Sequence, residues 1–179
     1  MNKNIISKIR NYKIAITGSN GFIASHLVAY LQIIGVQKKS LLLINSKTTD
    51  YSLKNLIIKF SKIDLVIHLS SATGGIKYTK DNMATQLYTT MTKDLNVFQA
   101  AKICNVKKVL TLGNFHAYPS QLKKNINEEY LFNGLPAPTH LGIGWSKRNL
   151  AVLSNVFSRN SNTKFIILYS ANAYGPGDS

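Results

Sequence analysis

The stretch Lys13-Ile-Ala-Ile-Thr-Gly-Ser-Asn-Gly-Phe-Ile-Ala24 decides the fold class of this chain. It starts as a short apolar run, turns at Gly18 and Gly21, and continues to Ile33 with apolar residues at helical spacing. This pattern predicts a buried strand, a tight turn and a helix. In that context Gly18 allows the turn, Gly21 lets backbone N–H groups approach a phosphate, and the helix N-terminus adds partial positive charge. An ordinary strand-to-helix turn, with glycines used only for their conformation, is the alternative.

The rest of the chain repeats this alternation of apolar strands and helices. Further strands are expected at Leu41–Ile44, Leu65–Leu69, Val109–Leu112 and Lys164–Tyr169, and further helices at Leu53–Phe60, Asp81–Cys104 and Ile143–Ser158. Such alternation implies a parallel sheet with helices on both faces, which is a Rossmann-like, doubly wound α/β fold. We expect residues 13–179 to form this domain after an N-terminal extension at residues 1–12.

The strand ends indicate where a ligand would bind. Open parallel sheets bind their ligands at the carboxyl ends of the strands, near the point where the strand order reverses. One cleft is therefore expected to be lined by the loops that follow Thr17, Ile44, Leu69, Leu112 and Tyr169.

The composition limits the function classes. A chain of 179 residues with 45% hydrophobic residues can bury a core, and it lacks an apolar run of the roughly 18 residues that a membrane span needs. Residues 1–12 lack the apolar core of a secretory signal and Cys104 is the single cysteine, so we expect a cytoplasmic protein without a membrane partner. The net charge of +15 comes mainly from scattered lysines, so nucleic-acid binding is only a distant third hypothesis. No metal site is expected.

The residues after the second expected strand bear on the choice of cofactor. A dinucleotide-binding sheet that prefers NAD places a carboxylate there for the ribose 2′-hydroxyl, whereas a basic residue suits the 2′-phosphate of NADP. The sequence at that point is Asn45-Ser-Lys47. We therefore predict NADP, with Ser46 and Lys47 near its phosphate. The alternative, that Lys47 is a solvated lysine and that NAD binds, stays open.

Several motifs together resemble the extended short-chain dehydrogenase/reductase family, that is, the NAD-dependent epimerase/dehydratase family. The glycine-rich segment at residues 17–27 resembles the family's fingerprint, with Ala24 in place of its usual third glycine. The order and spacing of the further motifs are most similar to the GDP-L-fucose synthase group. These motifs are His68-Leu-Ser-Ser-Ala-Thr-Gly-Gly-Ile76, Val106-Lys-Lys-Val-Leu110, Tyr118-Pro119, Asn127-Glu-Glu-Tyr-Leu131, Pro138-Thr139 and Asn172-Ala-Tyr-Gly-Pro176.

The resemblance implies an NAD(P)-binding domain that acts on a nucleotide-linked hexose, and a homodimer is the assembly that relatives in this family often form. Because members of the family continue well past the position of Ser179, most of their C-terminal substrate lobe is expected to be missing from this sequence. The expected cofactor contacts are Gly18, Asn20, Gly21, Phe22, Ile23, Ser46, Lys47, Leu69, Ser70, Ser71, Lys147 and Asn172.

In that family a serine, a tyrosine and a lysine carry the chemistry, and the resemblance leaves only the lysine in place. With the motifs aligned, Lys147 matches the lysine, Ile143 stands at the tyrosine and Asn114 at the serine. An isoleucine cannot transfer a proton. His116 falls at a cysteine that the resemblance links to epimerisation in the fucose synthase group, and an imidazole can exchange protons near neutral pH. The alternative is a histidine that lies at the surface or is held by packing.

We take Lys147, Asn114 and His116 as the candidate catalytic residues: Lys147 would orient the ribose, and Asn114 would hydrogen-bond a substrate oxygen. Tyr118 and Trp145 are the other conceivable substitutes for the missing tyrosine.

Two principal hypotheses follow. The chain is either a nucleotide-sugar epimerase or reductase with an unidentified acid, or a catalytically inactive dinucleotide-binding sensor or partner subunit.

Overall fold

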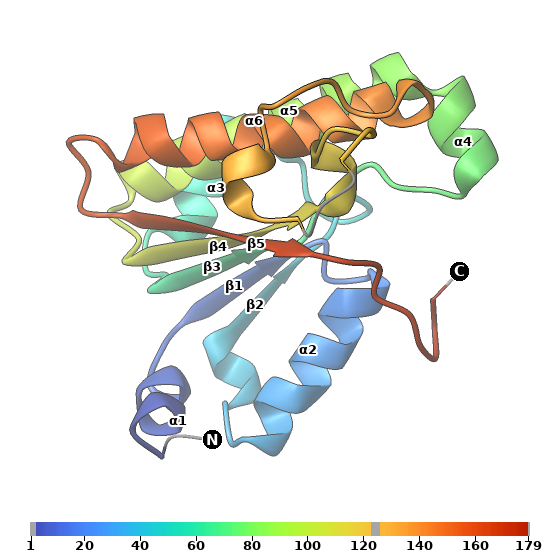
Figure 1. Ribbon diagram of the computed structural model, residues 1–179. Helices are drawn as coiled ribbons and strands as arrows, with labels where there is room; N and C mark the ends of the chain where they lie inside the picture. The colour runs from blue at the N-terminus through green and yellow to red at the C-terminus, as the bar shows by residue number, and fades with distance from the viewer. Residues whose placement is uncertain (1–2, 123–125, 179) are drawn as a thin grey trace.

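A single parallel sheet organises the chain, as Figure 1 shows for the computed structural model, which describes residues 3–122 and 126–178. The sheet contains the strands β1 (Ile14–Thr17), β2 (Leu41–Ile44), β3 (Leu65–His68), β4 (Lys108–Asn114) and β5 (Lys164–Ser170), in the order β2-β1-β3-β4-β5. The chain moves to one side of β1 to form β2 and to the other side to form the remaining strands. The topological switch point therefore lies between β1 and β3, and the Rossmann-like fold is confirmed.

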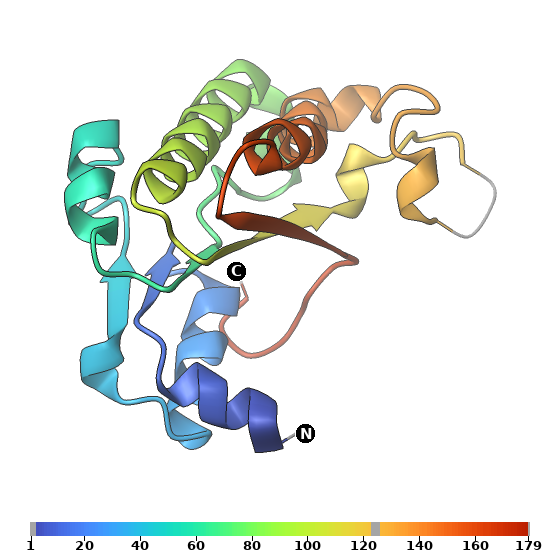
Figure 2. The ribbon, with the colours of Figure 1, turned by 90° about the vertical axis from the view of Figure 1, so that its left-hand side faces the viewer.

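Helices cover both faces of the sheet, as predicted. The helices are α1 (Lys3–Arg10), α2 (Phe22–Ile33), α3 (Leu53–Phe60), α4 (Ile76–Asp81), α5 (Met83–Ile103) and α6 (Leu141–Ser158). Short 3-10 helices lie at Lys38–Ser40, Phe115–Ala117, Glu128–Tyr130 and Pro138–His140. Figures 1 and 2 show α3, α5 and α6 on one side of the sheet and α1 and α2 on the other.

The core consists of two apolar layers, because side chains alternate between the faces of a strand. Ile14 and Ile16 of β1 pack with α2, whereas Ala15 between them packs in the layer that contains Phe98 of α5 and Phe165 of β5. The rings of Phe98 and Phe165 are stacked with centroids 4.7 Å apart. Thus a four-residue strand is enough to anchor helices on both faces.

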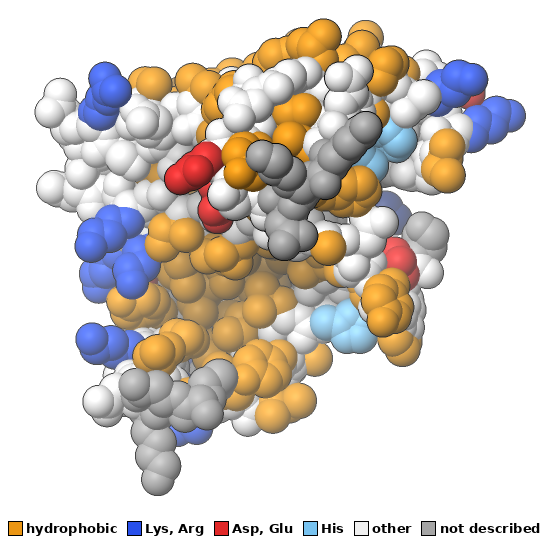
Figure 3. All heavy atoms as spheres, viewed as in Figure 1, with side chains coloured by type: hydrophobic (Ala, Val, Ile, Leu, Met, Phe, Trp, Pro, Cys, Tyr) orange, Lys and Arg blue, Asp and Glu red, His pale blue; other side chains and the backbone are white. Residues whose placement is uncertain are grey.

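The α2 face of the sheet is covered less completely near its edge. Ile166 and Leu168, which alternate with buried Phe165 on β5, are 39% and 48% exposed. Figure 3 shows apolar side chains on the molecular surface between β5 and α2.

The structure differs from the sequence-based expectations at several helix and strand boundaries. The helix expected at Asp81–Cys104 corresponds to α5, which begins at Met83, and α4 before it was not expected. The two helices are separated at Asn82, which has φ −124° and ψ 30° and whose side-chain amide donates to the carbonyl of Tyr78. Other boundaries move by one or two residues: for example, β4 continues to Asn114 and α6 begins two residues before Ile143.

Helix α1 was not expected from the sequence. It packs through Ile9 against the α2 layer, and the Arg10 guanidinium donates to the carbonyl of Ile34 at 2.6 Å. The domain boundary after residue 12 stays a prediction. Among the described helices, none has the length and apolar character required to cross a membrane.

Candidate functional site

The turn after β1 requires glycine at position 18. Gly18 has φ +67°, and a Cβ placed on it would lie 2.8 Å from the backbone nitrogen of Ser70 and 2.9 Å from the carbonyl of Leu69. Its N–H donates to the hydroxyl of Tyr51 at 3.1 Å. The absence of a side chain therefore lets the turn after β1 lie directly against the loop after β3.

The N-terminus of α2 opens beside this turn. Gly21 is the N-cap residue, no side chain caps the helix, and the first turn contains no acidic residue. The first N–H groups of a helix have no partner within the helix and carry partial positive charge. This helix end can therefore receive an anionic group, and Gly21, Phe22 and Ile23 line the adjacent cavity.

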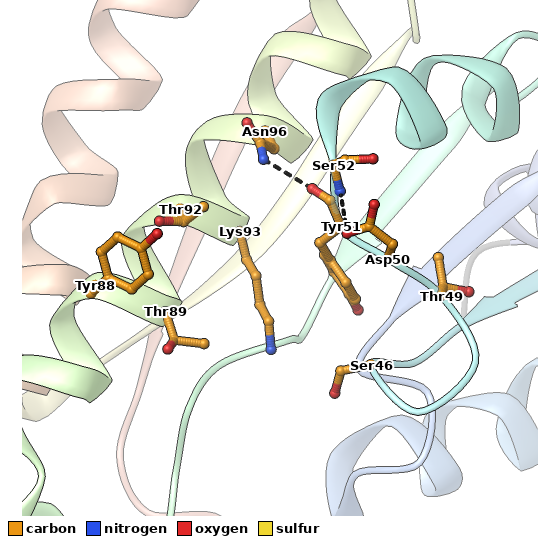
Figure 4. Close-up of a pocket in the computed structure, with 10 residues that line it drawn as sticks. All are labelled: Ser46, Thr49, Asp50, Tyr51, Ser52, Tyr88, Thr89, Thr92, Lys93 and Asn96. Atoms are coloured by element: carbon orange, nitrogen blue, oxygen red, sulfur yellow. Dashed lines mark hydrogen bonds between the residues drawn. The ribbon is translucent and has the colours of Figure 1, made fainter.

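Three cavities lie side by side along the carboxyl ends of the strands. The central one, of about 270 Å³, lies between the glycine turn and the loops after β2 and β3. Gly18 and Gly21 also line a second cavity, of about 280 Å³, which extends to the ends of β4 and β5. On the other side, Ser46 and Lys93 also line a third, outer cavity of about 390 Å³, shown in Figure 4. Together they form one elongated groove, which we call the strand-end groove.

The structure brings together all the residues predicted to contact a cofactor. Each of them lines at least one cavity of the strand-end groove: Gly18, Asn20, Gly21, Phe22, Ile23, Ser46, Lys47, Leu69, Ser70, Ser71, Lys147 and Asn172. The single cleft expected at the strand ends is therefore confirmed. That these residues bind a cofactor remains a prediction.

A buried chain of hydrogen bonds supports the floor of this groove. His68 Nε2 lies 2.8 Å from Oδ1 of Asp94, and His68 Nδ1 lies 2.6 Å from the hydroxyl of Thr17. The backbone N–H of Ser70 donates to the same hydroxyl at 3.4 Å. With a neutral imidazole protonated on Nε2, every donor in this chain has an acceptor. The network joins β1, β3 and α5 and fixes the loop after β3.

Lys147 projects from α6 into the cavity at the end of β4 and is 7% exposed. Burial lowers the pKa of its ammonium group, and the Asp94 carboxylate partly opposes that shift. A Cβ on Gly142 would overlap the backbone of Met83, so the start of α6 lies directly on the start of α5. This close contact sets the depth at which Lys147 enters the groove.

Asn114 lies beside Lys147 in the same cavity, at the end of β4. Its Oδ1 is buried and has no hydrogen-bond partner among the residues that the structure describes. The Asn114 side chain carries amide donors as well as this acceptor, so it can hydrogen-bond a ligand hydroxyl in the cavity that the residue lines. Ile143, one helical turn before Lys147, is 4% exposed, and its carbonyl accepts from the hydroxyl of Ser146.

His116 is placed apart from these side chains. Its ring stacks on that of His140 with centroids 4.1 Å apart, and it is not among the described residues that line the three cavities. Burial, and secondarily the neighbouring His140, lowers the pKa of His116. The groove therefore contains Lys147 and Asn114 but not His116, and a catalytic role for His116 stays a prediction.

Tyr118 and Trp145, the other conceivable proton donors, both pack against neighbouring side chains. Tyr118 is buried with its ring edge-to-face on Tyr169, and burial raises the pKa of its phenol. Trp145 packs against the guanidinium of Arg148, whose central carbon lies 4.9 Å from the ring centroid.

Sequence reasoning missed several residues of the groove, among them Lys93, Asp50 and Tyr51. Lys93 lines both the central and the outer cavity, and Asp50 and Tyr51 line the outer one. Asp50 is a carboxylate shortly after β2, in a region where the sequence analysis found none. The sequence carried no signal for Lys93, because its place in the groove depends on the rotation of the long helix α5 about its own axis.

Comparison with known proteins identifies the family. Residues 14–179 match the model of a family described as the NAD dependent epimerase/dehydratase family. The chain belongs to this family. The resemblance found in the glycine-rich turn and the later motifs is thereby confirmed, and the family is NAD(P)-dependent, as predicted.

The relatives are enzymes of GDP-linked sugars by their names. The chain is 27% identical over 173 residues to the GDP-L-colitose synthase of Yersinia pseudotuberculosis, covering 93% of this chain and 54% of that protein. It is 24% identical over 172 residues to a probable GDP-L-fucose synthase of Drosophila melanogaster, covering 93% and 53%.

A solved structure is similar across nearly the whole chain. A GDP-mannoheptose C4 reductase from Campylobacter jejuni with NADP bound superimposes with a TM-score of 0.87 at 26% identity, covering 95% of this chain and 54% of that chain. The chain thus spans about half the length of the curated relatives it matches.

Proposed function

We propose that the chain is an NADP-dependent reductase or epimerase of nucleotide-linked hexoses and that this domain binds its cofactor. The strand-end groove carries the proposal, because three joined cavities suit an elongated ligand with two nucleoside ends and phosphates between them. The names of the relatives support GDP-linked sugars as the substrate class, and the NADP in the Campylobacter jejuni reductase supports the cofactor.

The residues of the groove fit such a cofactor. The uncapped N-terminus of α2 and the Gly18 turn suit the pyrophosphate, and the positively charged central cavity, which includes Lys47 and Lys93, suits a further phosphate. The opposite cavity, with Lys147 and Asn172, suits the nicotinamide ribose. When bound, NADPH would supply the hydride for reduction of a sugar carbonyl.

We assign the side chains in this cavity to binding and orientation. The Lys147 ammonium can donate to ribose hydroxyls, and the Asn114 amide can hydrogen-bond a substrate hydroxyl. Since the buried Ile143 side chain has no exchangeable proton, an acid other than the family's tyrosine must protonate the sugar oxygen. His116 is the candidate from sequence, and reaching the substrate would require it to leave its stack on His140.

The direct test is hydride transfer from NADPH to a GDP-linked 4-keto sugar, followed as loss of NADPH absorbance. We expect slow oxidation of NADPH that depends on both the sugar and the protein. If NADPH binds but no tested GDP-linked keto sugar is reduced, the enzyme proposal fails and cofactor binding stands.

A second candidate function is dinucleotide binding without catalysis, as a sensor or a partner subunit. The observation in its favour is Ile143 at the position four residues before Lys147. The double variant Ile143→Tyr with Asn114→Ser distinguishes the two candidate functions. Gain of activity indicates an enzyme that has lost its catalytic acid. A variant that still binds NADPH but remains inactive favours a binding module.

A homodimer is part of the proposal. Helices α5 and α6 pack against each other and expose apolar side chains on their outer surface, namely Tyr88, Leu95, Val152 and Val156. Analytical ultracentrifugation tests this, and a monomer at all concentrations would contradict it.

A further inference from the structure

Lys93 occupies the junction between the central and outer cavities of the strand-end groove. It projects from α5, is half-buried, and shares the lining of both cavities with only one other residue, Ser46. Figure 4 shows its side chain directed into the groove between Tyr51 and Thr89, with Ser46 across the cavity. Its Nζ lies 5.1 Å from the centroid of the Tyr51 ring.

The charge of Lys93 is not paired. Among the described residues, no carboxylate oxygen lies within 4.0 Å of its Nζ. The neighbouring Asp94 points into the core, where one of its oxygens accepts from His68. Burial lowers the pKa of Lys93, and Asp94 opposes that shift. A partly desolvated ammonium whose direct contact is an aromatic face favours an anion as ligand.

The position of Lys93 in the groove indicates which anionic group of the cofactor it would bind. In this sheet the adenosine ribose is expected beside the residues that follow β2, which are Asn45, Ser46 and Lys47. The ribose would therefore lie at the junction that Ser46 and Lys93 share. Building on the proposed function, we propose that Lys93 binds the 2′-phosphate of NADP from the α5 side, opposite Ser46 and Lys47, and is a determinant of NADP specificity.

The charges around the junction favour this assignment. A 2′-phosphate carries up to two negative charges, and the central cavity contains two lysines, the exposed Lys47 and the half-buried Lys93. Asp50 lines the outer cavity but not the central one, and its Oδ1 accepts from the N–H of Ser52 at the start of α3. The outer cavity is thus left for the adenine, while the phosphate has a cationic compartment.

The test compares binding of NADPH, NADH, 2′,5′-ADP and 5′-ADP to wild type and Lys93→Met by calorimetry at one salt concentration. The matched control is Lys102→Met: Lys102 lies on the same helix and its Nζ is also over an aromatic ring, 5.9 Å from the Phe157 centroid, but it lines none of the three cavities. Loss of a charge-assisted hydrogen bond should raise the Kd of Lys93→Met for NADPH and 2′,5′-ADP about tenfold to a hundredfold.

The ligands without a 2′-phosphate distinguish the outcomes. We expect NADH and 5′-ADP to bind Lys93→Met as they bind wild type, and Lys102→Met to bind all four ligands as wild type does. An equal loss for NADPH and NADH would mean that Lys93 contacts the pyrophosphate, and no loss for either would leave it without a role; both overturn the inference while the proposed cofactor stands. If wild type binds neither NADPH nor NADH, the proposed function itself fails.

Discussion

Replacement of Gly18 by alanine should damage both the stability of the fold and its cofactor site. Two costs add at this position. An L-residue at φ +67° costs about 1–2 kcal/mol, and a Cβ 2.8 Å from the Ser70 nitrogen must displace the backbone after β3, which costs about 1–3 kcal/mol as for other overpacked sites. We therefore expect Gly18→Ala to lower the free energy of unfolding by about 2–5 kcal/mol.

A matched variant separates the two costs. Gly35→Ala has a similar backbone conformation, φ +92°, but its Cβ would meet the side chain of Arg10, which can move. Urea unfolding followed by circular dichroism should give a loss of about 1–2 kcal/mol for Gly35→Ala, with NADPH affinity retained. The reasoning is refuted if Gly18→Ala is no less stable than Gly35→Ala and binds NADPH as wild type does.

Three further changes test the network and the buried cations. Thr17→Val leaves the Ser70 N–H and Nδ1 of His68 without their hydrogen-bond partner and should cost about 1–3 kcal/mol by urea unfolding, whereas Thr17→Ser should cost less because it keeps the hydroxyl. Arg148→Leu removes donors at 2.9 Å from the Ala117 carbonyl and 2.7 Å from the Gly134 carbonyl, so a loss of about 2–5 kcal/mol is expected, and a thermally unchanged variant would contradict it. Burial lowers the pKa of Lys147 below 10.5, so the unfolded chain holds that proton more tightly and stability rises with pH towards 10.5. The free energy of unfolding of wild type should therefore rise relative to that of Lys147→Met between neutral pH and pH 10.5. A difference that does not change with pH would contradict the burial of a charged lysine.

The strands and the glycine turn were predictable because local pattern determines them. Helix α3 was placed at its observed bounds, since apolar spacing from Leu53 to Phe60 is unambiguous. The short helix α4 was not predicted, because the sequence pattern placed the start of a helix at Asp81 and did not indicate a separate turn of helix before Asn82. Helix α1 was missed because its stability depends on packing against α2 rather than on its own eight residues.

The candidate site was predictable where residues follow the ends of strands, and less so where helices contribute. Gly18, Ser46 and Ser71 reach the groove through strand order alone. Lys93 reaches it through the rotation of α5 about its own axis, which sequence spacing left open. The burial of Lys147 depends on the close approach of α6 to α5, a contact between segments that are distant in the sequence.

Titration of the chain with NADPH and then with NADH tests the central claim most directly, since every role proposed for the strand-end groove depends on dinucleotide binding. We predict saturable binding of one NADPH per chain, weaker binding of NADH, and loss of NADPH binding in Gly18→Ala. Absence of binding for both cofactors to the folded chain would contradict the account.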